Sequence, residues 1–280
     1  MSGSSWEDTH ATGLAVPSDR SLGDLTADLT RMLGDPDPAT REQIARPTLV
    51  GWIRQGVYDD LLAGLGDGMA SGLTVGLGER DTDTVFRRSY SALVLAECLH
   101  RDRDRQLVPA TKVLDWGDRV ATWLLRERDL RGYVSGRGRA GAVAHGADAL
   151  AELGRSPHVD TPELTVVLDV IADRVLADAD TRFVADESDR LAGATMAVLR
   201  RDRVPLSVVE PWVARLTTGA TRPTAGDGDT FLHTGDAEAF LRALHLQLAL
   251  APAPPEIRSD LLLVLVDALK TTNAAYLLPS

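Results

Sequence analysis

The chain has 280 residues, of which 44% are hydrophobic and 25% are charged, and its formal net charge is −11. This composition is typical of a globular protein and excludes a disordered chain. The acidic balance argues against a nucleic-acid partner, because nonspecific binding to phosphates depends on basic residues, and against an anionic membrane surface. The strongly apolar run at 261–266 is too short to cross a bilayer.

The N-terminal residues 1–20 contain no basic start followed by an apolar core, and no regularly spaced apolar residues. They are therefore not a secretory signal, and we predict a disordered leader that precedes a single domain at 21–280. The only cysteine, Cys98, excludes a disulfide within one chain, and a cytoplasmic location follows.

Apolar residues recur at steps of three and four along most of the domain, which is the period of an amphipathic helix. The first helix covers about 22–33 and ends at the "DPDP" string, because proline removes a backbone donor and restricts the residue before it. Further helices are predicted at about 44–53, 84–100, 111–130, 142–153, 162–178, 187–201, 206–217, 236–250 and 255–270. No segment alternates with a period of two, so we expect no strands.

Two stretches interrupt this helical pattern. Residues 61–80 are rich in glycine, which disfavours one continuous helix, and no Gly-Lys-Ser/Thr follows to make a phosphate loop. Residues 217–236 are long and polar for a helix connection, and we predict a loop that could act as a lid. His233 could reach a groove from this loop.

An acidic residue followed by an arginine about one helical turn later recurs along the chain, at intervals of roughly fifty residues or one missed repeat. The pairs are Asp37 with Arg41, Asp83 with Arg88, Asp186 with Arg190, and Asp236 with Arg242. An acid at a helix start caps free amides, and the arginine can pair with it or with the next repeat. The pattern resembles HEAT repeats and predicts an all-α, HEAT/armadillo-like solenoid of stacked antiparallel helical pairs with one concave face.

Longer strings resemble a bacterial family known only as a domain of unknown function. They are "TDTVFRRSYSALVLAECLHRDR", "LRERDLRGYVSGRGRAGAVAHGADAL", "DRLAGATMAVLRR" and "AFLRALHLQL". The similarity covers about residues 22–252, and "RDLRGYV" followed by "VAHGAD" is its most specific part. The resemblance implies an all-helical, HEAT-like fold and no known activity.

The sequence departs from that family just before "AVAH". Family members tend to carry Trp and His where this chain has Arg139 and Gly141. A histidine at 141 would place three ligand types on one helical face together with His145 and Asp148. Because the first ligand is absent, we expect no bound metal and no cofactor.

The stretch 126–148 leaves three interpretations open. It could be a glycine loop with a core His145 that pairs with Asp148 or a carbonyl, and with arginines that are solvated or paired with Glu127 and Asp129. It could be an anion pocket, in which the basic side chains approach a helix start with free amides. The third is acid/base catalysis, with Asp148 orienting His145 as the catalytic pair. The basic residues of the pocket are Arg131, Arg137 and Arg139, and Tyr133 would line the groove beside them.

These features predict a binding protein whose concave groove holds a protein segment or a small anionic metabolite, with no established catalysis. The alternative is a small-molecule enzyme of bacterial specialised metabolism with His145 in its pocket. A HEAT-like DNA glycosylase is a third possibility, and the acidic charge argues against it.

Overall fold

The computed structural model describes residues 6, 9–178, 180–221 and 230–277, apart from the side chains at 230, 231 and 233. The chain is mostly helical with little strand, which confirms the predicted all-α class. The elements in chain order are α2 (Leu22–Met32), the π-helical η1 (Ala39–Ala45), α3 (Arg46–Gln55), the 3₁₀ turn η2 (Asp59–Leu61), α4 (Leu62–Gly72), α5 (Thr84–Arg105), α6 (Ala110–Arg126), β1 (Tyr133–Val134), β2 (Gly138–Arg139), α7 (Ala142–Arg155), α8 (Thr161–Leu176), α9 (Glu187–Leu199), α10 (Leu206–Ala220), α11 (Thr230–Leu250), α12 (Arg258–Thr272) and α13 (Ala274–Leu277).

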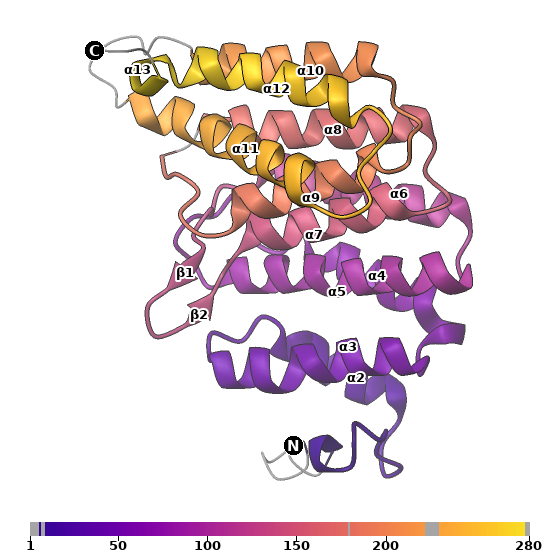
Figure 1. Ribbon diagram of the computed structural model, residues 1–280. Coiled ribbons are helices and arrows are strands. Elements are labelled where there is room, and N and C mark those ends of the chain that lie inside the picture. The colour runs from indigo at the N-terminus through magenta and orange to yellow at the C-terminus, as the bar shows by residue number, and fades with distance from the viewer. Residues whose placement is uncertain (1–5, 7–8, 179, 222–229, 278–280) are drawn as a thin grey trace.

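The helices pack in two layers that follow chain order from the N-terminal end at the bottom of Figure 1 to the C-terminal end at the top. In one layer, which we call the odd layer, α3, α5, α7, α9 and α11 each contact the next helix in that order. In the even layer, α4, α6, α8, α10 and α12 do the same. Contacts between the layers join α4 to α5, α6 to α7, α8 to α9 and α10 to α11.

Small residues let α7 approach its neighbours closely at the centre of the stack. A Cβ added at Gly154 would lie 3.1 Å from the Val198 side chain of α9 and 3.3 Å from the Val198 backbone nitrogen. A Cβ added at Gly146 would lie 2.8 Å from the Leu124 side chain of α6. The alanines and glycines of α7 therefore let it pack closely against its neighbours in the odd layer and against the even layer. Close packing excludes larger side chains at these positions.

The expectation of no strands is wrong at residues 133–139. There β1 and β2 form an antiparallel pair, with Tyr133 opposite Arg139 and Val134 opposite Gly138. Gly138 has a φ of +80°, and a Cβ there would lie 2.8 Å from the Glu42 carboxylate. Two-residue strands are too short to show an alternating pattern, so this hairpin leaves no periodic signal in the sequence.

The described part of the predicted leader, residues 6 and 9–20, packs on the domain. Trp6 is 3% exposed. The Trp52 indole Nε1 donates to the Leu14 carbonyl at 2.7 Å, and the Gln55 amide donates to the Gly13 carbonyl at 3.1 Å. These contacts dock the leader on α3.

The four repeat arginines lie in different surroundings. Arg41 and Arg88 are completely buried, whereas Arg190 and Arg242 are partly exposed. Among the described residues, the predicted ion pair with the preceding acid is found only between Asp186 and Arg190, at 2.7 Å. The repeat thus predicts where helices lie but not which groups their arginines bind.

Replacing Trp6 with Ala should lower the free energy of unfolding by about 3 kcal/mol, because truncating a buried aromatic side chain leaves a cavity. The matched control is Tyr133→Ala, an aromatic side chain that is 71% exposed, which should change stability by less than about 0.5 kcal/mol. Urea unfolding measures both. Equal stability of the Trp6 variant and the parent would contradict the docked leader.

Candidate functional site

The predicted catalytic pair of His145 and Asp148 does not form. His145 is 3% exposed, and its Nδ1 lies 2.7 Å from the Ser89 hydroxyl oxygen. Because that hydroxyl donates its hydrogen to the Ala140 carbonyl, His145 Nδ1 is the donor to Ser89. Asp148 instead accepts from the Arg190 guanidinium at 2.6 Å. This arrangement fits the interpretation of His145 as a hydrogen-bonded core residue.

Burial also removes the proton affinity that acid/base chemistry near neutral pH requires. Desolvation by burial, together with the smaller effects of the positive charges of Arg139, Arg190 and Arg46, lowers the pKa of His145 to about 3. The imidazole is therefore neutral at pH 7 and a weak base.

At the predicted anion pocket before α7, each of the three arginines pairs with a carboxylate of the fold. Arg131 makes a bidentate pair with Asp129, at 2.7 and 2.6 Å. Arg137 is paired with Asp83, and Arg139 is paired with Asp186.

Tyr133 and His233 are the two remaining predicted site residues. Tyr133 is 71% exposed on β1. His233 lies in α11, and its side chain is outside the described part of the structure. The predicted loop at 217–236 is shorter than expected, because α10 extends to Ala220 and α11 begins at Thr230. The middle of this loop, at 222–229, lies outside the described residues.

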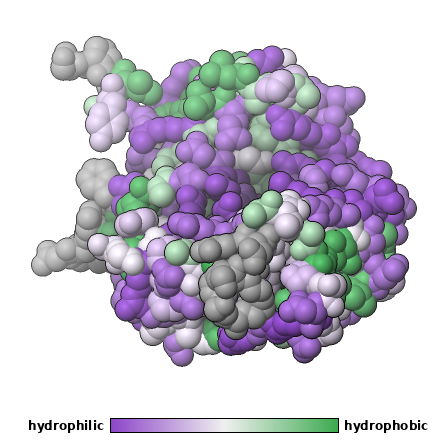
Figure 2. Space-filling model, turned by 90° about the horizontal axis from the view of Figure 1, so that it is seen from below, coloured by the Kyte–Doolittle hydropathy of each residue, from purple (hydrophilic) through white to green (hydrophobic). Residues whose placement is uncertain are grey.

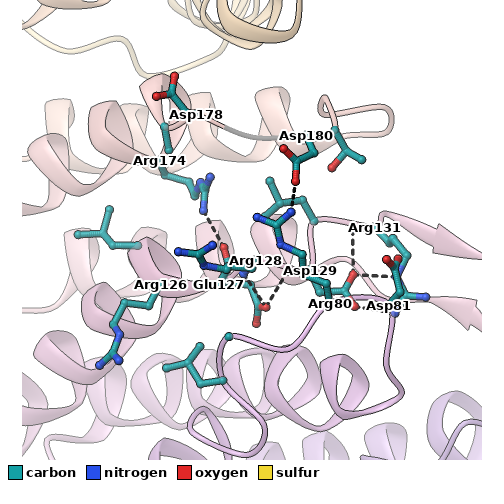
Figure 3. Close-up of a pocket in the computed structure, with 16 residues that line it drawn as sticks. Arg80, Asp81, Arg126, Glu127, Arg128, Asp129, Arg131, Arg174, Asp178 and Asp180 are labelled. Carbon is teal, nitrogen blue, oxygen red and sulfur yellow. Dashed lines mark hydrogen bonds and ion pairs between the residues drawn. The ribbon is translucent and has the colours of Figure 1, made fainter.

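A cavity of about 470 Å³ lies instead where three segments meet at one edge of the stack. The segments are 77–81 after α4, 125–131 at the end of α6, and 174–181 at the end of α8 (Figure 3). Five arginines line it, namely Arg80, Arg126, Arg128, Arg131 and Arg174. Of these, the sequence analysis singled out Arg131 alone.

A buried glutamate shapes the middle segment of this cavity. Glu127 accepts two hydrogen bonds from Arg88, at 2.6 and 2.9 Å, and one from the Trp123 indole at 2.9 Å. It also accepts from the backbone nitrogens of Arg128 and Asp129, both at 3.0 Å. With Glu127 held inward, the chain leaves the helix in an extended conformation and exposes the side chain of Arg128.

Arg174 supplies an unneutralised charge at the cavity wall. It is 4% exposed, and its Nη1 donates only to the carbonyls of Leu124 and Glu127, at 3.3 and 3.0 Å (Figure 3). Within the described residues its Nε has no hydrogen-bond partner. Burial lowers the pKa of Arg174, and the opposing effects of Asp236 and Glu127 are smaller. A buried guanidinium without a bound carboxylate favours an anion beside it.

The other arginines of the cavity differ in how firmly they are held. Arg131 is fixed by Asp129, as described above. Arg80 contacts Asp180 from the opposite segment, and both side chains are substantially exposed. Arg126 and Arg128 are exposed at the rim, and no carboxylate among the described residues pairs with either.

The described part of the chain lacks both a cluster of metal-ligating side chains and a helix suited to cross a membrane. No three His, Cys, Asp or Glu side chains there lie together in a way that could hold a metal ion. None of the helices found there combines the length and apolar character needed to cross a membrane.

The family described as "Protein of unknown function (DUF2785)" matches residues 73–246, more than half of the sequence. The chain belongs to this family. The match is narrower than the expected 22–252, and it includes every segment that lines the cavity. Neither a curated protein nor a solved structure matched the chain.

Acidification should test the buried state of His145. The folded pKa lies below the unfolded value, so between about 6.5 and 3 the unfolded chain binds more protons and stability falls as the pH falls. From pH 7 to pH 5 this group should remove about 2 kcal/mol from the free energy of unfolding.

His145→Gln should abolish that part of the loss, whereas the control His100→Gln, at a half-exposed position, should retain it. Urea titrations at both pH values measure the difference. If His145→Gln loses as much free energy of unfolding between pH 7 and pH 5 as the parent does, His145 is not a buried neutral group in the parent.

Proposed function

We propose that the protein is a HEAT-like helical solenoid that binds a small organic anion in the cavity between the segments 77–81, 125–131 and 174–181. The observation that carries this proposal is Arg174, a buried guanidinium at the wall of a cavity of about 470 Å³ with no carboxylate bound to it. The volume falls in the range typical of small-molecule sites.

The two-layer packing supports the solenoid part of the proposal. Each helical pair contacts the pair before it and the pair after it, as in repeat proteins. From α5 to α11 the helices of the odd layer contact one another more extensively than the helices of the even layer between α6 and α12, so the odd layer is the closer-packed one there. A stack that is narrower on one side curves toward that side, and the odd layer would then form the concave face.

The walls of the cavity suit an organic anion rather than a bare ion. Leu77, Leu125 and Leu130 line it beside the arginines. Leu125 is 40% exposed, so an apolar part of a ligand could cover it. The arginines can bind a carboxylate or phosphate through paired N–H donors.

Binding of a protein segment by the odd layer is the second candidate function. A cavity of about 280 Å³ lies over α5, α7 and α9, and it is lined by Glu97, Asp148 and Glu152. These carboxylates already pair within the fold, Glu97 with Arg54 and Asp148 with Arg190. A peptide bound there would have to compete with these ion pairs. The end of the stack that is seen from the N-terminal side is also mostly hydrophilic (Figure 2). We therefore favour the anion site.

The enzyme and glycosylase alternatives have less support. His145 is buried and neutral, which does not suit a catalytic base, and the net charge of −11 does not suit DNA. A cytoplasmic location and the lack of nucleic-acid and membrane partners remain predictions.

Phosphate should raise the thermal stability of the protein, because a ligand bound only by the folded state stabilises it. At a phosphate concentration ten times the dissociation constant, the free energy of unfolding should rise by about 1.4 kcal/mol, which corresponds to about 4 °C in Tm. The measurement is thermal unfolding in sodium phosphate against sodium chloride at equal ionic strength.

Arg128→Gln should reduce this gain, because Arg128 lies at the rim without a carboxylate partner. The control Arg215→Gln removes a half-exposed arginine that does not line the cavity, and it should keep the full gain. Because phosphate also stabilises proteins nonspecifically, the contrast between the variants decides the outcome. An equal gain in both variants would reject the site.

A further inference from the structure

We infer that the ligand of this cavity is an elongated molecule with two separate anionic groups, one bound at Arg174 and one bound at Arg80 in place of Asp180. This inference rests on the proposed anion site and specifies its ligand class.

The first observation is that Arg80 already binds a carboxylate across the cavity. Asp180 reaches it from the segment after α8, whereas Arg80 belongs to the segment after α4 (Figure 3). The side chains are 45% and 75% exposed. An ion pair between exposed side chains contributes little to stability, so a ligand carboxylate or phosphate could replace Asp180 at small cost.

The second observation is that Arg174 provides a separate binding position. The carbonyls at the end of α6 anchor its guanidinium. Among the described residues, no carboxylate bridges Arg174 and Arg80, since Asp180 pairs with Arg80 alone. Arg128 lies on the adjacent segment and can add a second donor group there. Arg174 and Arg80 therefore offer two binding positions on different segments of the cavity wall.

The third observation concerns the carboxylates that line the cavity. Arg88 holds Glu127 and Arg131 holds Asp129, so neither carboxylate is available to Arg80 or Arg174. Asp81 and Asp178 keep the net charge of the cavity low. Attraction through overall charge is therefore weak, and affinity depends on matching both arginines at once.

Glutarate and butyrate provide the test, because they differ in one carboxylate on a similar carbon chain. Isothermal titration calorimetry at constant ionic strength should give glutarate an affinity about tenfold higher than butyrate, since a charge-assisted contact is added. Pyrophosphate against phosphate compares two phosphoryl groups with one, and the stronger binder of glutarate and pyrophosphate identifies which chemistry the site prefers.

Two variants assign the second position. Arg80→Gln should remove the advantage of the dianion, so that glutarate and butyrate bind the variant with equal affinity. Asp180→Asn should strengthen dianion binding several-fold, because it removes the competing carboxylate. Arg215→Gln is again the control, and it should behave as the parent.

The outcomes separate this inference from the proposed function. Saturable binding of monoanions and dianions with equal affinity, or a dianion advantage that survives Arg80→Gln, overturns the two-group ligand and leaves the anion site standing. Failure of every anion to bind the parent protein overturns both.

Discussion

Arg88 and Glu127 form a completely buried ion pair, and the geometry of the candidate site depends on it. Arg88 also donates to the carbonyls of Val75 and Gly76, at 2.8 and 2.9 Å, so one guanidinium joins the segment after α4 to the end of α6. Two of the three segments around the cavity are thereby fixed to α5. Separating buried charges leaves each without solvation, so such a pair resists local rearrangement. Two of the three sides of the cavity are consequently tied to the core of the fold.

A second recurring interaction joins successive helices of the stack. Helix C termini leave carbonyl groups without partners, and arginines from following segments bind them. Arg174 does this at the end of α6, and Arg201 donates to the carbonyls of Gly154 and Ser156 beyond α7, at 3.1 and 2.7 Å. Arg258 donates to the carbonyls of Leu248 and Ala249 at the end of α11. Arg174 differs from the other two because it also lines the large cavity and keeps an unpartnered Nε, which links a structural interaction to ligand binding.

Periodicity predicts the helices well because each amphipathic face is a local property of ten to twenty residues. It could not predict the site, because the contacts that build it are distant in sequence. Arg88 and Glu127 are 39 residues apart, and Arg174 lies 50 residues from the Leu124 carbonyl that it binds. The docking of Trp6 is likewise invisible, since a single apolar residue in a polar leader has no period. The stretch 126–148 that the sequence singles out includes part of the cavity wall. Its Glu127 is buried in an ion pair with Arg88, and no pattern in the sequence distinguishes the exposed Arg126 and Arg128.

The most direct measurement of the central claim is the position of a bound anion in a crystal structure grown with pyrophosphate. The account predicts the anion in the cavity, within hydrogen-bonding distance of the Arg174 and Arg80 guanidinium groups, with Asp180 no longer bound to Arg80. An anion bound instead by Arg137 and Arg139, or a cavity that holds only ordered water around Arg174 at saturating pyrophosphate, would contradict it.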